Sequence, residues 1–357
     1  MDITKKIELV KEVGEEIIEE KELQELFQTN DHPIAYDGFE PSGRIHIAQG
    51  LLRTTNVNKL TKTGIKFKFW VADWFALMNN KLGGDLNKIR TVGEYFIEVW
   101  KACGMDLDNV EFLWASENMN QEYWLRVVKI GTLNTVTRIT RCAQIMGRSE
   151  SEKLTGAQIF YPCMQASDIF QLNADIAQLG LDQRKVNVLA REVAPKLGFK
   201  KPIAVHHHML MSLQPKLSKN KSKIENAIDM KMSKSDPDSA IFMTDTSKEV
   251  NRKIQKAYCS EGEITNNPVL EYCKYIIFEN FKEFTIDRER KFGGPITFQN
   301  YNELESAFAK KEVHPTDLKT STASRINELL KPVLLHFQKN NKATELERLV
   351  LSYKVTR

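Results

Sequence analysis

The alternation of short apolar strands with amphipathic helical stretches restricts the fold of this chain more than any other feature. The residue types of buried strands recur over residues 34–36, 65–72, 110–114, 175–179 and 203–206. Helical patterns separate these segments, notably over residues 88–103 and 184–197. Strands that alternate with helices predict an α/β fold with a doubly wound parallel sheet, in which ligands bind beyond the carboxyl ends of the strands.

The length and the distribution of these patterns predict two domains. At 357 residues, the chain can bury a core in each of them. We expect an α/β domain over residues 31–244 and a mostly helical domain over residues 245–357, where Gly293-Gly294-Pro295 is the clearest break. Within the first domain, residues 115–160 lie between strands and are helical in pattern. Residues 212–238 are polar and rich in lysine, which is typical of a loop.

Residues 1–30 are predicted to form an N-terminal helical segment. Across residues 5–27, apolar side chains share one helical stripe while Glu and Lys occupy the other faces. The residues of this stripe are Ile7, Val10, Val13 and Ile17. We therefore expect one amphipathic helix that docks on the α/β domain.

Composition excludes several classes of protein. A hydrophobic content of 41% and a charged content of 27% are ordinary for a soluble globular protein, and a net charge of only +4 excludes a strongly basic nucleic-acid binder. The five cysteines are scattered and form no CxxC pair, which suits reduced thiols and not a metal site. The N-terminus has no apolar signal core, and no apolar run approaches the roughly 20 residues of a membrane span. We expect a cytoplasmic protein that does not enter a membrane.

A candidate anion site follows the first predicted strand. Pro41-Ser42-Gly43 is predicted to form a tight turn, and a helix is predicted from about residue 47 to residue 60. Free N–H groups at a turn and at a helix N-terminus both point toward a bound phosphate. His46 lies where this helix begins and could donate to phosphate oxygens. A histidine that is buried or that caps the helix is the alternative.

A second cationic motif lies far downstream, at Lys231-Met232-Ser233-Lys234-Ser235. It places two ammonium groups and two hydroxyls within five residues. Such a segment can neutralise the charge that develops on a polyphosphate during its reaction. A solvated charged surface is the alternative for this motif taken alone.

A polar stripe in an apolar stretch predicts a binding face. Tyr161, Gln165 and Asp168 recur at helical spacing, so they share one face if the residues after Pro162 are helical. That face must meet either solvent or a ligand. The run 206–208 consists of three histidines, for which we expect a structural or pocket-wall role and no metal.

The two motifs together resemble the signatures of the class I aminoacyl-tRNA synthetases. His46-Ile47-Ala48-Gln49 is similar to the HIGH signature, and residues 231–235 match the KMSKS signature without a mismatch. Phe39-Glu40-Pro41-Ser42-Gly43, with Tyr36 ahead of it, resembles the tyrosyl-tRNA synthetases of the archaeal and eukaryotic cytosolic type. The same likeness continues through residues 161–168, 182–185 and 314–319, so it covers nearly the whole chain.

The resemblance implies a tyrosine-specific ATP-dependent ligase with a Rossmann-like catalytic domain and an anticodon-binding helical domain. The implied tyrosine-binding residues are Tyr36, Glu40, Tyr161, Gln165, Asp168 and Gln183. The implied ATP-binding residues are Gly43, His46, Ala48, Gln49, Lys231, Met232, Ser233, Lys234 and Ser235. Of these, His46, Lys231 and Lys234 would carry the catalytic charge stabilisation. Tyr36 and Asp168 would meet the phenolic hydroxyl, while Glu40 either lies beside the amino-acid pocket or faces solvent.

The resemblance also implies partners. ATP would enter with Mg²⁺ held by phosphates and water, and not by a protein cage. In relatives, the insertion at residues 115–160 forms a homodimer interface and touches the tRNA acceptor end, which Arg138, Arg141 and Arg148 could approach. Phe292 would stack on the first anticodon base of tRNA(Tyr), and Asp317 would read its guanine edge. A core phenylalanine and a helix-capping aspartate are the alternatives for these last two residues.

Two departures and two rival functions stay open at this point. Ala48 and Gln49 stand where many class I enzymes have glycine and histidine, although eukaryotic relatives tolerate alanine. The rival functions are a tryptophanyl-tRNA synthetase and a catalytically silent RNA-binding paralogue. Asp168 favours a substrate with a hydroxyl group, and the intact lysine motif argues against a silent protein.

Overall fold

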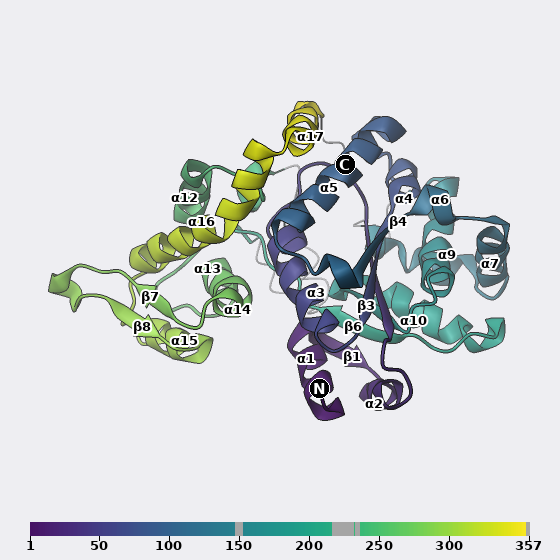
Figure 1. The fold of residues 1–357 in the computed structure, drawn as a ribbon, viewed down its shortest axis with the longest axis horizontal. Coiled ribbons are helices and arrows are strands. Elements are labelled where there is room, and N and C mark those ends of the chain that lie inside the picture. Colours follow the sequence, from purple (N-terminus) through teal and green to yellow (C-terminus); the bar gives the residue numbers. More distant parts are fainter. Residues whose placement is uncertain (147–152, 216–231, 233–235, 355–357) are drawn as a thin grey trace.

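A six-stranded sheet lies at the centre of the molecule, parallel except at one edge (Figure 1). The computed structural model describes residues 1–146, 153–215, 232 and 236–354. In sheet order the strands are β1 (Gly14–Ile18), β6 (Ile203–His207), β5 (Ile176–Gly180), β2 (Ile34–Phe39), β3 (Lys66–Val71) and β4 (Val110–Trp114). The predicted α/β fold with a doubly wound parallel sheet is confirmed, and each of the five predicted strands is present.

Helices cover both faces of this sheet. The helices of the first half are α1 (Ile3–Val13), α2 (Glu20–Thr29), α3 (Arg53–Thr61), α4 (Asp73–Met78), α5 (Leu86–Ala102), α6 (Ala115–Asn118), α7 (Gln121–Thr132), α8 (Val136–Thr140), α9 (Gly156–Gln171) and α10 (Arg184–Val193). Short 3₁₀ turns are η2 (Lys81–Gly84), η3 (Leu107–Asn109), η4 (Ala143–Met146), η5 (Leu181–Gln183) and η6 (Pro195–Leu197). The helices predicted over residues 88–103 and 184–197 correspond to α5 and to α10 with η6.

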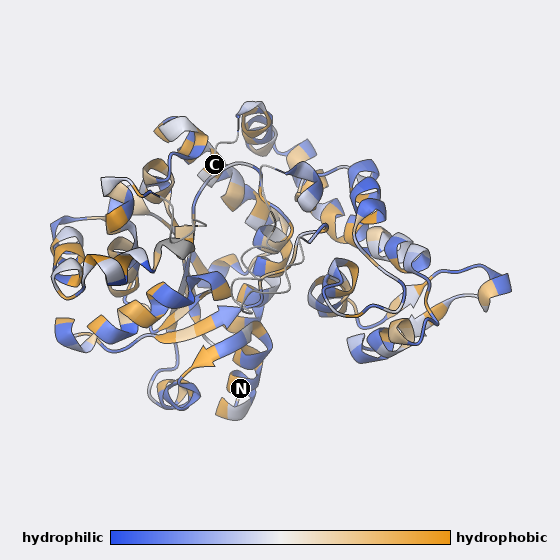
Figure 2. Cartoon of the chain, turned by 180° about the vertical axis from the view of Figure 1, so that it is seen from behind, coloured by the Kyte–Doolittle hydropathy of each residue, from blue (hydrophilic) through white to orange (hydrophobic). Residues whose placement is uncertain are grey.

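Alternation along the strands sorts their side chains into two cores. On β3, Phe67 and Phe69 pack with buried residues of α1, α3 and α5, whereas Trp70 joins the core formed with α7, α9 and α10. On β2, Ala35 belongs to the first core and Tyr36 to the second. Period-two alternation therefore decides which strand residues face α9. Figure 2 shows mainly hydrophobic strands inside helices that alternate between hydrophobic and hydrophilic residues.

The prediction of a single helix over residues 5–27 is wrong. The stretch divides into α1, β1 and α2, and β1 pairs antiparallel with β6. Gly14 ends α1, and it packs so closely on β6 that an added Cβ would lie 3.0 Å from Val205. The β-branched pair Ile17-Ile18 suits the strand. Pairing with the exposed edge of β6 outweighed the helical periodicity of the sequence.

The C-terminal part is mostly helical and forms a separate lobe beside the sheet (Figure 1). Its helices are α12 (Ser247–Lys256), α13 (Pro268–Tyr272), α14 (Phe278–Asn280), α15 (Tyr301–Ala309), α16 (Pro315–Lys339) and α17 (Asn341–Ser352). A hairpin of β7 (Phe284–Ile286) and β8 (Ile296–Phe298) accompanies them, with the turns η7 (Pro237–Ser239), η8 (Cys273–Ile277) and η9 (Arg290–Phe292).

The C-terminal lobe shares a hydrophobic core with the part of the chain that contains the sheet. Helix α17 returns to pack against α5, and the hydrophobic core is continuous from Val10 to Val350. The break predicted at residues 293–295 lies in the β7–β8 hairpin, between η9 and β8. Among the described helices, none combines the length and the apolar character that a membrane crossing requires.

Candidate active site

The site lies where the direction of winding reverses in the sheet. The chain runs from β2 to β3 and β4 on one side, and then crosses over to β5, which pairs with the other side of β2. Tyr36 of β2 lies opposite Ala177 of β5. Such a reversal leaves a crevice at the carboxyl ends of the two strands, where α/β proteins bind ligands.

Helix α9 presents its polar stripe to this crevice. It begins with a capping box formed by Thr155 and Gln158 and runs through Pro162, so the predicted helix starts earlier than expected. Tyr161, Gln165 and Asp168 are 6%, 7% and 2% exposed. Their burial excludes the solvated-face alternative. The three side chains therefore form an inward-facing polar surface beneath the sheet.

A buried carboxylate is the most constrained group of this surface. Asp168 accepts a 2.8 Å hydrogen bond from the Tyr123 hydroxyl, and burial raises the pKa of the Asp168 carboxyl well above its ordinary value. The Tyr123 bond and the nearby Arg126 guanidinium oppose this shift. The Tyr36 hydroxyl is also buried and has no hydrogen-bond partner among the described residues. Burial raises the pKa of Tyr36 well above its ordinary value, and the nearby Gln165 side chain opposes that rise. These groups leave hydrogen-bonding capacity for a ligand.

The other end of the pocket is a chain of hydrogen bonds. Glu40 follows β2 and accepts bonds of 2.5 Å each from the Tyr161 hydroxyl and the Asn79 amide. Gln165 donates to Gln183 at 2.9 Å. Glu40 is half-buried and engaged, so it is not a strand-end charge that only faces solvent. The six residues expected to bind the amino acid are thus close together.

The start of the first signature pairs through its backbone with a segment that follows the second signature in the chain. His46 makes an isolated antiparallel bridge with Phe242. Backbone bonds of 2.8 and 3.0 Å flank it and join residues 45–47 to residues 241–243. Gly43 precedes this pairing with φ at +131°, a left-handed conformation that favours glycine. The first signature therefore lies next to a described segment, residues 241–243, that is almost 200 residues away in the chain.

The helix predicted over residues 47–60 is confirmed, with a difference at its start. It opens as a π-helical turn, η1 (Ala48–Leu52), and continues as α3. Gly50 packs against Met243 so tightly that an added Cβ would lie 2.5 Å from its Cγ. The π-helical first turn is wider than an α-helical turn, and it packs directly against the segment that follows the second signature.

The remaining ATP-site predictions divide between described and masked residues. Ala48 and Gln49 are half-buried at the start of η1, and the Gln49 Oε1 is buried without a hydrogen bond to the described residues. Met232 is 7% exposed and joins the first core. The predicted residues outside the described part of the chain are Arg148, Lys231, Ser233, Lys234 and Ser235.

Sequence reasoning missed an ion pair next to Tyr36. Asp37 points to the opposite face of β2 and pairs with Arg53 of α3 at 2.9 Å, with both side chains buried. Burial raises the pKa of Asp37 to about 6, and Arg53 opposes this rise. Arg53 also contacts His207, whose pKa is lowered by burial. The strand alternation could have placed Asp37 on this face, but nothing in the sequence indicated its partner.

Tyr123 was also missed, because its sequence context is that of a core aromatic residue. It lies on the stripe Tyr123, Val127 and Ile130 of α7, which the sequence identifies only as apolar. Its hydroxyl reaches Asp168, 45 positions away in the chain. No local pattern predicts a contact of that range.

The three consecutive histidines are structural. His206 contacts Glu16 at 2.8 Å, and His208 contacts Glu15 at 3.0 Å and Glu271 at 3.2 Å. These carboxylates come partly from β1, the strand that the sequence did not reveal. Among the described residues no group of His, Cys, Asp and Glu side chains could hold a metal ion.

The residues expected to contact tRNA lie at the surface where they are described. Phe292 ends η9 and is 62% exposed, so it is not a core phenylalanine. Asp317 lies in the first turn of α16, whose N-cap is His314, so Asp317 is not the capping residue. Arg138 pairs with Glu192 at 2.9 Å, and Arg141 is exposed.

Comparison with known proteins places this geometry in a family. The family described as tRNA synthetases class I (W and Y) matches residues 28–331. Tyrosine–tRNA ligase 1, cytoplasmic, of Arabidopsis thaliana is 51% identical over 100% of this chain and 90% of its own length. Tyrosyl-tRNA synthetase of Pyrococcus horikoshii, complexed with L-tyrosine, has a TM-score of 0.91 at 40% identity, covering 98% of this chain and 100% of that one.

Longer and more distant proteins are also similar. The Leishmania major tyrosyl-tRNA synthetase in complex with tyrosinol has a TM-score of 0.90 at 47% identity, and this chain spans 61% of it. A tryptophanyl-tRNA synthetase from Aeropyrum pernix K1 has a TM-score of 0.66 at 17% identity, which shows a shared fold and nothing further.

The buried carboxylate generates a testable pH dependence of stability. The pKa of the Asp168 carboxyl is raised in the folded protein, so the folded state favours the protonated form. The contribution of Asp168 to the free energy of unfolding is therefore fully present below the pKa of about 3.9 that an aspartate has in the unfolded chain. It is lost as pH rises through the pKa of the folded state. Asp168→Asn cannot ionise, and we expect it to become increasingly more stable than the wild type as pH rises. Urea unfolding of the substrate-free proteins between about pH 5 and about pH 8 measures this difference.

Asp108→Asn is the matched control, because Asp108 is exposed in η3. The control should follow the wild type at every pH. A stability difference for Asp168→Asn that does not change with pH would contradict the assigned burial penalty.

Proposed function

The chain belongs to the class I tRNA synthetases of the tryptophan and tyrosine family, and we propose that it is a tyrosine–tRNA ligase. It would activate L-tyrosine with ATP to tyrosyl-adenylate and transfer tyrosine to the 3′ end of tRNA(Tyr). Asp168 carries this proposal, because it is a buried carboxylate that the described residues compensate with the Tyr123 hydroxyl and the nearby Arg126 guanidinium. The tyrosine ligases among its relatives support the same assignment.

The pocket is suited to a substrate with a phenolic hydroxyl. Such a hydroxyl can donate to Asp168 and accept from Tyr36, so both buried groups gain a partner. Phenylalanine would leave the carboxylate without that donor, at a cost of about 1–3 kcal/mol or more. Tyr161, Gln165 and Gln183 would hold the α-amino end, with Glu40 fixing the Tyr161 hydroxyl.

Adenylate formation needs positioning and charge stabilisation more than a protein nucleophile. An oxygen of the tyrosine carboxylate attacks the α-phosphorus of ATP and forms a mixed acyl–phosphate anhydride bond, while the bond from the α-phosphorus to the bridging oxygen breaks and pyrophosphate leaves with that oxygen. We assign Gly43, His46, Ala48 and Gln49 to the ATP side because they surround the turn and helix N-terminus that suit phosphate binding. The sequence assigns Lys231, Lys234 and the rest of that motif to the same polyphosphate, with Mg²⁺ entering as part of the ATP substrate.

Tryptophan is a poorer match for these groups. An indole N–H can donate to Asp168, but it cannot accept a hydrogen bond from Tyr36. The tryptophanyl-tRNA synthetase neighbour shares only the fold at 17% identity. A silent RNA-binding paralogue is disfavoured because the tyrosine-pocket residues are present and gathered in one place.

The C-terminal lobe and the insertion would provide the tRNA contacts. Phe292 is exposed and can stack on an anticodon base, and Asp317 is free of a capping role and can accept from a guanine edge. Arg138 and Arg141 would lie toward the acceptor end. We accordingly assign residues 31–244 as the catalytic domain with its connecting insertion at 115–160, residues 245–357 as the anticodon-binding domain, and residues 1–30 as an N-terminal extension of the sheet.

We further propose that the chain acts as a cytoplasmic homodimer. Apolar side chains are exposed along the insertion, where they could form a self-complementary surface: Trp124, Leu125, Val128, Leu133, Val136 and Phe160. Clusters of exposed apolar residues of this kind are typical of protein–protein interfaces. The cytoplasmic location follows the name of the Arabidopsis relative.

Exchange of labelled pyrophosphate into ATP tests the proposed activity. Run separately with tyrosine, tryptophan and phenylalanine, it should occur with tyrosine and be weaker by orders of magnitude with the other two. Exchange driven by tryptophan would establish the rival synthetase. Absence of exchange with all three amino acids would point to a silent paralogue.

Tyr123→Phe tests the hydroxyl-reading pocket. Removing its hydrogen bond to Asp168 should lower the tyrosine-over-phenylalanine ratio of kcat/KM by about tenfold, because a bond to a charged group contributes about 1.5–3 kcal/mol. The KM for ATP should stay unchanged. Tyr301→Phe is the matched control, since Tyr301 donates a 2.8 Å bond to Glu305 in the C-terminal lobe. Equal loss of discrimination in both variants would reject the role of Tyr123.

Val128→Asp tests the proposed dimer surface. A buried charge at the interface should convert the protein to a monomer in analytical ultracentrifugation, because an unpaired carboxylate is costly to desolvate. Leu351→Asp changes an equally exposed apolar residue on α17 and should leave the dimer intact. A wild-type protein that sediments as a monomer would refute the assembly.

A further inference from the structure

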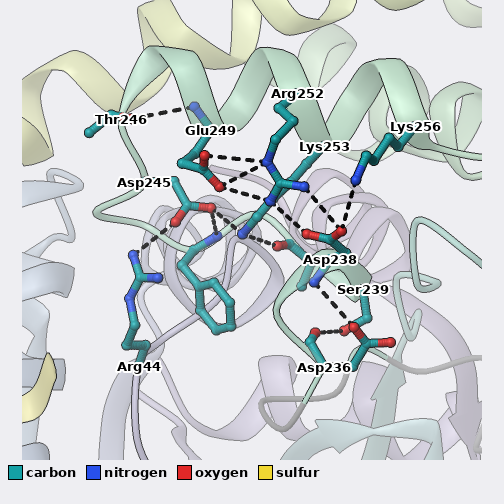
Figure 3. A network of polar contacts seen from close by, with 12 residues as sticks. Arg44, Asp236, Asp238, Ser239, Asp245, Thr246, Glu249, Arg252, Lys253 and Lys256 are labelled. Atoms are coloured by element: carbon teal, nitrogen blue, oxygen red, sulfur yellow. Dashed lines mark hydrogen bonds and ion pairs between the residues drawn. The ribbon is translucent and has the colours of Figure 1, made fainter. Parts of the chain in front are cut away.

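A buried charge cluster lies beside the paired signature segments (Figure 3). Asp245 is its centre. One carboxylate oxygen accepts from the Arg44 guanidinium at 2.9 Å, and the other accepts from the Lys253 ammonium at 2.6 Å and from the Phe242 backbone N–H at 3.0 Å. We call Arg44, Phe242, Asp245 and Lys253 the signature junction.

The junction is buried and its charges are arranged around an aromatic ring. The side chains of Lys253 and Asp245 are 2% and 3% exposed, and that of Arg44 is 25% exposed. Both cations lie over the Phe242 ring, whose centroid is 4.5 Å from the Arg44 guanidinium carbon and 4.7 Å from the Lys253 ammonium. Burial lowers the pKa of Lys253 while Asp245 acts against that shift. Loss of either cation would therefore leave a buried carboxylate less well compensated.

The junction joins parts of the chain that belong to different functional units. Arg44 precedes His46 by two positions, and Asp245 follows by two positions the segment 241–243 that pairs with residues 45–47. Lys253 belongs to α12, which packs against α16 of the C-terminal lobe. Lys253 also donates to the backbone carbonyl of Ala240 at 2.9 Å, so it holds both ends of that segment.

Another set of ion pairs in the same view is less constrained. Asp238 accepts two bonds from Arg252, at 2.6 and 3.0 Å, and contacts Lys256 at 3.5 Å. These side chains are about one third to one half exposed, and exposed pairs contribute little to stability. The buried junction is therefore the stronger constraint on residues 240–245.

We propose that Arg44, Asp245 and Lys253 are positioning residues for the ATP step, which hold His46 and the segment after the second signature in register. This inference rests on the proposed function. The pairing of residues 45–47 with residues 241–243 consists of one bridge and its flanking backbone hydrogen bonds. A pairing this short would open readily if its ends were not anchored. A displacement of about 1 Å in a preorganised site can cost about a hundredfold in rate, so the anchoring bears directly on catalysis.

The anchoring can be measured without any substrate. Arg44→Met and Lys253→Met should accelerate amide hydrogen exchange at Ile47 and Met243, whose N–H groups form the flanking backbone bonds. Arg325→Met is the matched control, because Arg325 also lies over an aromatic ring, at 4.7 Å from Phe281, and pairs with a carboxylate. Arg325 lies on α16, pairs there with Glu328 and should leave both amides unchanged. Unchanged exchange in the junction variants would overturn the proposal.

The kinetic consequence separates positioning from general stability. In tyrosine-dependent pyrophosphate exchange, both junction variants should lose about tenfold to a hundredfold in kcat/KM for ATP, while the equilibrium affinity for tyrosine stays within about twofold. Equal loss for ATP and tyrosine, or normal kinetics despite faster amide exchange, would each refute the positioning role. Arg44→Lys and Lys253→Arg keep the charges and should recover most of the activity, and they replace the Met variants if those do not fold.

The two measurements also separate this inference from the proposed function. Failure of the wild type to exchange pyrophosphate with tyrosine would count against the function alone. The amide measurement would still decide whether the junction anchors the pairing.

Discussion

The burial of the Asp168 carboxylate away from water is the constraint on which the rest of the site depends. A carboxylate without water must find donors, and the described residues supply Tyr123 as its direct hydrogen-bond donor. Its position on α9 places it beneath Tyr36, a second buried hydroxyl with spare hydrogen-bonding capacity. A ligand that both donates and accepts at one atom completes both groups.

The topology of the sheet determines where the proposed tyrosine-binding residues lie relative to the proposed ATP-binding residues. Because β2 and β5 are adjacent at the point where the winding reverses, the residues that follow them line one crevice. Alternation along β2 separates Tyr36, which faces α9, from Asp37, which pairs with Arg53 on the other side. The backbone pairing of residues 45–47 with residues 241–243 then brings the first signature next to the segment that follows the second. Glu40 directly follows β2 and Gly43 comes three residues later, so the two proposed sets of binding residues both involve the end of this strand and the segment after it.

Much of this arrangement was predictable from the sequence because it follows local periodicity. The five parallel strands, the helix after Gly43 and the polar face of α9 each have a regular residue pattern. Strand β1 was not predictable, because its residues also fit a helical stripe and only the edge of β6 selects the strand. The bond from Tyr123 to Asp168 depends on tertiary packing of α7 on α9, which no local pattern records.

The charged junction illustrates the same limit. Arg44, Asp245 and Lys253 each look like ordinary surface charges in the sequence, and only the fold brings them together beside Phe242, with Asp245 and Lys253 buried. The lysine signature shows the opposite case, since its chemistry is evident from the sequence although most of it lies outside the described residues. Sequence patterns identify chemistry best where the required residues are adjacent in the chain.

A crystal structure with bound L-tyrosine tests most directly whether this pocket recognises a phenolic oxygen. We expect the oxygen within hydrogen-bonding distance of both Asp168 and Tyr36, with the amino group near Tyr161 and Gln165. A tyrosine bound in the reverse direction, with its phenolic oxygen away from Asp168, would contradict this account of the site.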